Sequence, residues 1–358
     1  MSEVKYKSLH FDEAIAFFRD KLNVPTEHFD DLVGEMHAKG FMVAGAMKAE
    51  LISDLRGAVD KVIAQGGTLE GFRKDFDKIV ADHGWRYKGG RNWRTRVIYH
   101  TNLRQAYNAG RWGQLTDPDV VKLRPYLMYR HSGSAHPRKP HLALNGLVLE
   151  HDDPFWNTHA PQNGWGCNCR LDSLSRGDLK RMGKAGPDTA PKVEYREHTD
   201  RNGVASKVPV GVDPGFDYNV GKARDRSYKS LAGRMESLDT QTASYWVNEG
   251  LRGPVFKRFF EGEIQGDFPV AALSADRRKA LGGGAQMVWL SEADLGARAG
   301  VDLADYMLIP KIIAQGEIEQ VGNGVVLSLS EGRLYRMNLE PDGDGALHVK
   351  NFTGEDHG

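Results

Sequence analysis

Apolar positions in the first hundred residues repeat at the spacing of an amphipathic helix. The first helix is predicted to stop at the glycine pair 66–67. Its apolar face consists of Leu51, Leu55, Val59, Val62 and Ile63. Thr68 is a suitable N-cap for a second helix. The apolar face of that helix consists of Phe72, Phe76, Ile79 and Val80. These patterns predict a helical region over residues 1–85.

A third helix is predicted over residues 92–112, where basic and aromatic side chains are interleaved. Such a combination can hold nucleic acid by phosphate contact and base stacking. Aromatic residues at this spacing are more often buried. We therefore interpret one side of the helix as core, with arginines that brace the following segment or a partner.

Beyond residue 123 the pattern changes to short apolar runs between turn residues. Asn145-Gly146 lies between two apolar runs and predicts a tight hairpin turn. Pro161, Gly164 and Gly166 exclude a helix before the strand Cys-Asn-Cys-Arg-Leu. Residues 123–171 are therefore predicted to be a β-hairpin-rich unit.

The segments that follow this unit are polar. Residues 183–191 and 194–205 contain few apolar side chains and predict extended surface chain. Residues 222–238 predict a polar helix. This helix would close a second domain over residues 86–239.

Residues 240–358 predict a separate domain. Helical signals at 244–262 and 304–316 flank an isolated strand candidate at 286–290. Four short runs separated by turns then predict an antiparallel meander: EIEQV, GVVLSLS, GRLYRMNLE and ALHVKNF. The chain is thus expected to be α+β, with an N-terminal helical region, a β-hairpin-rich His/Cys unit and a separate C-terminal α+β domain.

Both cysteines of the chain, Cys167 and Cys169, follow a cluster of histidines. Two cysteines in 358 residues argue against a disulfide framework and favour reduced thiols or a metal. Alternate residues of an extended chain share a face, so both sulfur atoms can reach one ion. His141 and His159 would complete a tetrahedral set of two sulfur and two nitrogen ligands, which suits a structural zinc ion.

Other interpretations of this segment remain open. The thiols could be small buried apolar groups, with the histidines bonded to backbone carbonyls. A nucleophilic Cys-His pair would need a lowered thiol pKa and an oxyanion site, which the sequence does not identify. Asp152 and Asp153 could be a catalytic pair, but adjacent residues of an extended chain face opposite ways, which favours turn capping.

Charge is unevenly distributed along a chain whose formal net charge is zero. Residues 1–239 contain 37 Lys and Arg against 31 Asp and Glu, whereas residues 240–358 contain 11 against 17. Residues 86–140 alone contain 12 basic and two acidic side chains. This density attracts a polyanion such as double-stranded DNA, while a solvated basic face or an acidic partner protein fits equally well. The predicted contact residues are Arg86, Arg91, Arg94, Arg96, Arg104, Arg111, Arg130, Arg138 and Lys139.

No apolar run reaches eighteen residues, and the start, MSEVKYKSLHFDE, has no apolar signal region. We therefore expect a protein that is made in the cytosol and has no membrane contact.

The segment HLALNGLVLEHDDPFWNTHAPQNGWGCNCRL resembles the closing signature of the phage Mu F-like head morphogenesis proteins. In that family a histidine and an Asn-Gly or Asp-Gly turn typically precede HxPPNGWGCRCR. The resemblance extends through KGFMVAGAMKAELISDLRGAV, HTNLRQAYNAGRW and GVDPGFDYNVG, and covers about residues 10–235. Gln162 stands where a second proline is common. His131-Ser132-Gly133 stands where Asp-x-Arg is frequent, which weakens the transfer of a polar role to that site.

The resemblance implies a minor head protein of a tailed bacteriophage or prophage that acts in head assembly, DNA packaging or DNA delivery. Its implied partners are the portal protein, other head proteins and packaged DNA. Its implied location is the head interior or portal vertex of the virion, and the bacterial cytoplasm during assembly. No small-molecule substrate and no enzymatic activity are implied.

The last domain resembles, through weaker motifs, the nuclease-like modules of the barnase, EndoU, colicin and RelE grouping. These motifs are VWLSEADL, DYMLIPKIIAQGEI and GRLYRMNL. RNA cleavage would need a base, an acid and a cation on the phosphate. The candidates are His348, Arg333, Tyr335 and Lys350. Because an acidic domain binds RNA poorly, a binding module is expected, with a virion-delivered, metal-independent RNase as the alternative.

Overall fold

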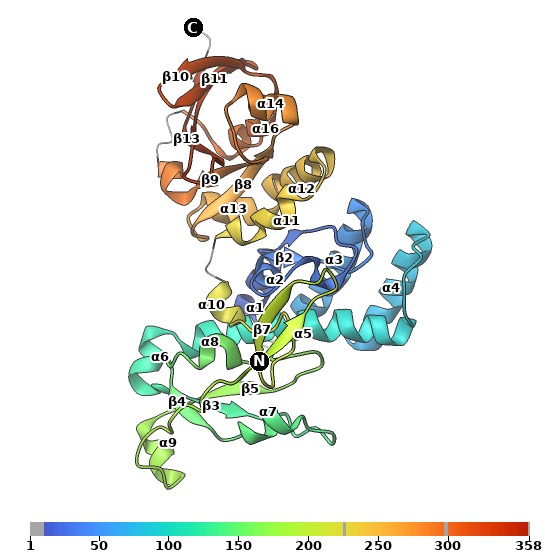
Figure 1. Ribbon diagram of the computed structural model, residues 1–358, viewed down its shortest axis with the longest axis vertical. Helices are drawn as coiled ribbons and strands as arrows, with labels where there is room; N and C mark the ends of the chain where they lie inside the picture. The colour runs from blue at the N-terminus through green and yellow to red at the C-terminus, as the bar shows by residue number, and fades with distance from the viewer. Residues whose placement is uncertain (1–10, 225–226, 297–299, 357–358) are drawn as a thin grey trace, which may run out of the picture. The chain divides into compact units, whose positions relative to one another are not determined.

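The computed structural model describes residues 11–224, 227–296 and 300–356, which form two compact units. The first unit contains the described residues up to Lys21 and Pro25–Arg224, and the second contains Leu22–Val24 and the described residues after Arg224 (Figure 1). The borders differ from those predicted at residues 85 and 239. Helices of the predicted first region share one unit with residues 86–224, and the second unit begins before residue 239.

The first half of the first unit is helical, as predicted. Its elements are α1 (Asp12–Arg19), η1 (Phe29–Asp31), α2 (Met36–Lys39), β2 (Gly40–Phe41), α3 (Ala49–Gln65), α4 (Leu69–His83), α5 (Arg91–Leu115) and α6 (Pro118–Leu123). Gly66 ends α3 in the left-handed region at φ 74°, which glycine adopts without strain. The Thr68 side chain caps α4 by accepting a hydrogen bond from the Gly71 N–H at 3.1 Å. Both predicted helix boundaries are confirmed.

The long helix α5 is the centre of this helical part. A glycine, Gly110, lets α1 approach it closely: a Cβ at Gly110 would lie 2.7 Å from the backbone nitrogen of Ala14 and 2.9 Å from the Phe11 ring. Phe11 also packs edge-on against Tyr107, with ring centroids 5.7 Å apart. One side of α5 is therefore core, as predicted, but of its four aromatic residues only Trp112 is buried, and Trp93 is 60% exposed.

A three-stranded antiparallel sheet follows, in the order β4-β3-β5. Its strands are β3 (Tyr126–Arg130), β4 (Val148–Glu150) and β5 (Arg170–Leu174), with α7 (Lys139–Ala143), α8 (Trp156–His159) and α9 (Arg176–Arg181) around them. The hairpin predicted at Asn145-Gly146 is wrong for one of its two strands. The run before the turn is helix α7, because Pro140 favours a helix start, and the strand after it pairs with β3.

The remaining elements of the first unit are β6 (Tyr195–Thr199), β7 (Ala205–Pro209) and α10 (Val220–Ala223). Strands β6 and β7 pair into a two-stranded antiparallel ribbon whose residues are mostly exposed. The chain predicted as extended over 194–205 is therefore extended, but it is paired. Asp153 accepts a hydrogen bond from the Phe155 N–H at 2.8 Å, so the turn-capping interpretation of that carboxylate is confirmed.

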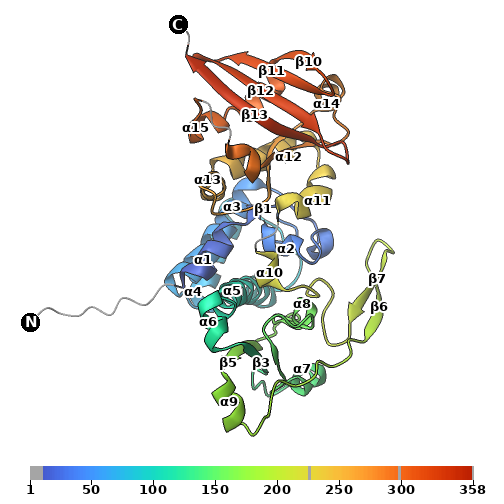
Figure 2. The same cartoon turned by 90° about the vertical axis from the view of Figure 1, so that its left-hand side faces the viewer.

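The second unit is built on a six-stranded sheet in the order β10-β11-β12-β13-β9-β8. Figure 2 shows β10 to β13 side by side. The strands are β8 (Asp267–Ala272), β9 (Met287–Ser291), β10 (Glu317–Val321), β11 (Gly324–Ser330), β12 (Arg333–Pro341) and β13 (Leu347–Asp356). The other elements are β1 (Leu22–Asn23), η2 (Tyr228–Leu231), α11 (Ala232–Glu236), α12 (Thr240–Arg252), α13 (Pro254–Phe260), α14 (Ala275–Ala280), η3 (Glu292–Gly296), α15 (Leu303–Tyr306) and α16 (Ile309–Gln315).

The antiparallel meander predicted at the end of the chain is confirmed as β10 to β13. The strand predicted as isolated, β9, instead pairs in parallel with β13 and antiparallel with β8, which was not predicted. The polar helix predicted over 222–238 is broken into short elements around Tyr228, whose ring packs on Phe268 at 5.1 Å. The α+β class is confirmed.

Among the described residues, none of the helices combines the length and the apolar composition that crossing a bilayer requires.

Candidate functional site

The sequence places one histidine and both cysteines in the same buried position. Helix α7 supplies His141, and the extended segment before β5 supplies Cys167 and Cys169, with the exposed Asn168 between them. The Nδ1 atom of His141 lies 3.7 Å from the Sγ of Cys167 and 3.9 Å from the Sγ of Cys169. All three residues are at most 6% exposed. The predicted one-face arrangement of the two sulfur atoms is present, and the three side chains converge on one point.

The imidazole of His141 is oriented by a backbone carbonyl. Its Nε2 lies 2.7 Å from the oxygen of Gly211, so Nε2 carries a proton and Nδ1 is the ring nitrogen that faces the sulfur atoms. Gly211 has φ 90°, and a Cβ there would lie 2.7 Å from the Cβ of Pro140. Only glycine brings this carbonyl so close to α7.

Hydrogen bonds favour negative charge on the cysteine pair. The neighbouring Cys167 thiol, and after it the His141 ring, lower the pKa of Cys169. The thiol of Cys167 keeps its proton, because its bond to Cys169 and its burial raise its pKa.

His159, predicted as the fourth metal ligand, is not part of this cluster. Its Nδ1 lies 2.8 Å from the Thr158 hydroxyl, and its ring stacks on Phe155 with centroids 4.2 Å apart. Burial and the nearby His141 lower the pKa of His159 to about 4. His159 does not join the cluster because helix α8 and the Phe155 ring hold its side chain beside the site.

A clamp holds the loop that connects His159 to Cys167. Arg138 forms an ion pair with Asp213 at 3.0 Å and donates a hydrogen bond to the Trp165 carbonyl at 2.8 Å. The same Asp213 carboxylate accepts a hydrogen bond from the Trp165 N–H at 2.9 Å. This pair lies directly against Gly164, where a Cβ would be 2.3 Å from both side chains. The motifs PQNGWGC and GVDPG are therefore one structural feature.

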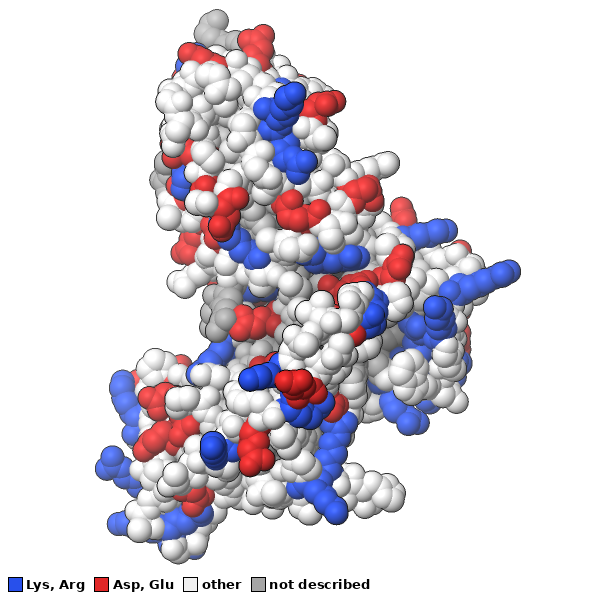
Figure 3. Space-filling model, in the orientation of Figure 1, with Lys and Arg blue, Asp and Glu red and all other residues white. Residues whose placement is uncertain are grey.

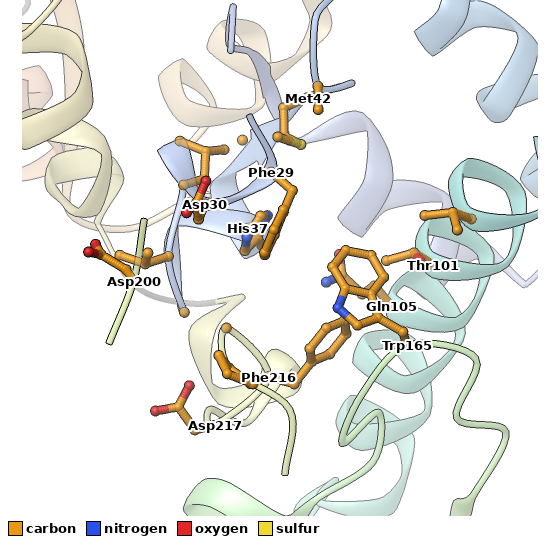
Figure 4. A pocket seen from close by; sticks show the side chains of 18 of the residues that line it. Phe29, Asp30, His37, Met42, Thr101, Gln105, Trp165, Asp200, Phe216 and Asp217 are labelled. Carbon is orange, nitrogen blue, oxygen red and sulfur yellow. The ribbon is translucent and has the colours of Figure 1, made fainter. Parts of the chain in front are cut away.

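The clamped loop forms part of a groove of about 1030 Å³ in the first unit. Trp165 packs edge-on against Phe216 and against Phe29, with centroids 5.0 Å and 5.7 Å apart (Figure 4). Phe29, Trp93 and Val204 also line the groove and are 49%, 60% and 61% exposed. Sequence analysis did not predict the groove, because its aromatic residues come from η1, α5 and two separate motifs.

Charged groups lie at the base and the rim of the groove. The Lys21 ammonium donates hydrogen bonds to the His37 carbonyl and to the Gln105 amide oxygen, and burial lowers the pKa of Lys21 to about 7. Burial also lowers the pKa of His37 to about 4. Asp200 and Asp217 also line the groove (Figure 4).

Five of the nine predicted DNA or partner contacts already bond to other groups of the chain. Arg91, Arg130 and Arg138 pair with carboxylates of Asp77, Asp172 and Asp213. Arg94 donates to the carbonyls of Lys88 and Ala44, and Arg111 donates to Gln114. Arg104 is partly buried. Of the nine, Arg86, Arg96 and Lys139 are exposed and form no such bond in the described part of the chain. Basic and acidic side chains are interspersed on the face shown in Figure 3.

The four candidate nuclease residues of the second unit do not meet: Arg333 and Tyr335 share Asp305, whereas His348 and Lys350 lie farther along β13. Tyr335 on β12 is opposite Gly354, six residues along β13 from His348, or roughly 20 Å at about 3.3 Å per residue. The Tyr335 hydroxyl donates to Asp305 at 2.7 Å, and Arg333 pairs with Asp356 at 2.7 Å. His348 is 6% exposed and lies 3.1 Å from Asp342, while Lys350 pairs with Asp294. The structure does not combine them into one site.

Comparison with known proteins gives three findings. Residues 53–172 match the profile of the family described as "Phage Mu protein F like protein". The chain is 30% identical over 242 residues to "Putative capsid assembly protein F" of Escherichia phage Mu, covering 59% of this chain and 54% of that protein. It is 31% identical over 211 residues to "Mu-like prophage FluMu F protein" of Haemophilus influenzae, covering 52% and 50%.

The chain spans about half the length of the curated relatives that it matches. No solved structure matches it significantly. The nuclease-like resemblance of the last domain stays a prediction. The resemblance stated for the His/Cys segment is confirmed, since the matched residues contain both cysteines and His141, and the chain is similar to the phage Mu F-like proteins over this part of its length.

Proposed function

We propose that this protein acts in the assembly of the head of a tailed bacteriophage or prophage, as a minor component next to the portal. The observation that carries the proposal is the similarity to a protein named for capsid assembly, over more than half of the chain. The matched residues 53–172 run from α3 to β5 and include the core cluster that contains Trp112, Leu127 and both cysteines. The protein would act in the virion head or at the portal vertex.

Within this role, the groove is the surface for contact with another head protein. Large exposed apolar patches mark interaction sites, and Phe29, Trp93, Trp165 and Val204 supply such a patch. Asp200 and Asp217 lie at the same groove. Opposite charges across an interface steer association and select partners. The occupant would therefore be a segment, from the portal or another head protein, that carries an apolar side chain beside Lys or Arg.

The basic segment favours a protein partner over packaged DNA. Three of its nine candidate cations already pair with carboxylates. The three exposed cations, Arg86, Arg96 and Lys139, provide less free positive charge than the sequence implied. DNA affinity depends mainly on the number of phosphates that a protein neutralises.

The proposal is tested by co-purification of the full chain with the portal protein of the same phage. Trp165→Ala is expected to weaken the complex about tenfold or more, because a partly exposed aromatic anchor dominates such interfaces. Leu123→Ala is the matched control, since Leu123 is 76% exposed and lies outside the groove. Equal binding by the two variants would remove the groove from the function. No binding by the unmodified chain to any head protein would contradict the assembly role itself.

A further inference from the structure

We propose that His141, Cys167 and Cys169 bind one zinc ion, and that this ion ties helix α7 to the loop that carries Trp165. The proposal concerns the stability of the first unit and does not depend on the partner that the protein binds.

The separations between the ligand atoms fit a single tetrahedral metal. With Zn–S distances of about 2.3 Å and a Zn–N distance of about 2.0–2.1 Å, sulfur and nitrogen lie about 3.5–3.6 Å apart. The observed distances from Nδ1 of His141 are 3.7 Å and 3.9 Å, and all three ligand atoms lie within 4.8 Å of one another. Small shifts of the side chains would therefore complete the metal geometry.

The groups around these ligands have the arrangement that zinc sites use. A metal-binding imidazole commonly donates its other N–H to a carbonyl, as Nε2 of His141 does to Gly211 at 2.7 Å. Two thiolates and one Zn²⁺ are together neutral, which removes the cost of isolated charge in a buried site.

Two sulfur ligands and one imidazole select zinc among the common divalent ions. Calcium and magnesium take oxygen ligands, whereas zinc binds thiolate and imidazole. Among the described residues the cluster supplies three ligands. Tyr129 donates its hydroxyl proton to Asn163 at 3.0 Å, and His159 is held by Thr158. We assign the fourth position to a water molecule.

The ion would join segments that are distant in sequence. His141 and Cys167 are separated by 26 residues, and the segment between them contains β4 and α8. A cross-link of this kind stabilises the folded chain because metal binding is coupled to folding. It would also fix the loop of Trp165, which is otherwise held by the Arg138–Asp213 clamp.

The first test is the metal content of the full chain, purified from cells grown with added zinc and dialysed without chelator. The expected result is about one zinc per chain, and about one Co²⁺ per chain with a thiolate-to-cobalt absorption band after exchange. A zinc content near zero, with no uptake from zinc solution by the reduced protein, would overturn the proposal. A disulfide between Cys167 and Cys169 in protein purified under reducing conditions would also overturn the proposal.

The second test assigns the ligands. Cys167→Ser, Cys169→Ser and His141→Gln are each expected to lower zinc affinity at least tenfold, whereas His159→Gln keeps the full zinc content. A folded His159→Gln chain without zinc would contradict the three-ligand set.

Since ligand variants can fail to fold, hydrogen exchange of the unmodified chain is measured with and without chelator. Faster exchange is expected over residues 161–170 and not over β8 to β13, and equal exchange would contradict the cross-link.

Discussion

At the scale of single residues, the fold depends on glycines where two backbones meet. Gly211 and Gly164 each occupy a position without room for a methyl group, and each lies beside a side chain that organises the His/Cys site. The neighbouring buried Asn163 satisfies its own groups by accepting from Tyr129 and donating to the Ala160 carbonyl. Small residues and fully bonded polar residues thus set the position of the Trp165 loop.

We predict that Gly211→Ala destabilises the protein more than Gly203→Ala. Both positions have a left-handed φ, 90° and 81°, so both substitutions incur strain of about 1–2 kcal/mol. At Gly203 no atom lies within 4 Å of an added Cβ, whereas at Gly211 the Cβ of Pro140 is 2.7 Å away. Chemical denaturation measures both variants. Equal losses of unfolding free energy would show that the contact with Pro140 carries no cost.

A second residue-scale prediction concerns acid stability at the groove. His37 has a pKa of about 4 in the folded chain and about 6.5 when unfolded, because burial and Lys21 oppose its charge. The unfolded chain therefore binds the proton first, and the unfolding free energy falls as the pH decreases from 6.5 to 4, by up to about 3 kcal/mol. The measurement is the unfolding free energy of the wild type and of His37→Gln between pH 6.5 and pH 4. The variant should lose less stability on acidification, and an equal loss in both proteins would refute the prediction.

At the scale of elements, several features could be predicted from sequence because their signals are local. The end of α3 at Gly66, the Thr68 cap of α4 and the meander β10 to β13 all depend on neighbouring residues. Strand β8 and its pairing with β9 were not predicted, because partners distant in sequence leave no local period.

The candidate site was predictable to a similar extent. The shared face of Cys167 and Cys169 follows from strand geometry, and His141 was named with them. His159 was also named, but its nearness in sequence to Cys167 did not determine where helix α8 would direct its ring. The groove combines residues from Lys21 to Asp217, so no single stretch of sequence could have indicated it.

A matched pair of helix glycines tests the packing of α1 on α5. Gly57→Ala in α3 is expected to stabilise the protein by about 0.5–1 kcal/mol, because no atom lies within 4 Å of an added Cβ and alanine favours helix. Gly110→Ala in α5 is expected to destabilise it by about 1–3 kcal/mol, because the added Cβ meets the Ala14 backbone at 2.7 Å. Thermal unfolding of both variants measures whether each substitution raises or lowers stability. A stabilising Gly110→Ala would show that α1 is not closely packed against α5 there.

At the scale of the whole molecule, the net charge of zero conceals a basic part, residues 1–239, and an acidic part, residues 240–358. Internal ion pairs consume part of the basic excess, as those of Arg91 and Arg130 show. The last part combines a buried His348 with dispersed candidate residues. Neither feature favours a nucleic-acid enzyme.

The charge distribution predicts weak binding of the full chain to duplex DNA. Each neutralised phosphate contributes about −0.9 to the slope of log K against log salt, so three exposed cations give a slope of about −3. Replacing Arg86, Arg96 and Lys139 together with Gln should make the slope less steep by about 3, while Arg130→Gln should change it little. A slope much steeper than −3 would restore packaged DNA as the partner.

The dispersed residues of the second unit predict no RNA cleavage by the full chain. Incubation with total RNA over a range of salt and pH should give the same fragment pattern for the unmodified chain and for His348→Ala. Cleavage that His348→Ala abolishes would instead support the delivered-effector alternative.

The contact between the segments PQNGWGC and GVDPG determines where the chain can accept insertions. The residues between these motifs do not need a fixed length, provided that Arg138 and Asp213 can still reach each other across Gly164. The exposed turn at Gly183, just after α9, lies in this intervening stretch. New sequence inserted there would be presented outward while the two halves of the loop stay joined, so this position offers a natural entry point for grafted epitopes or acquired modules.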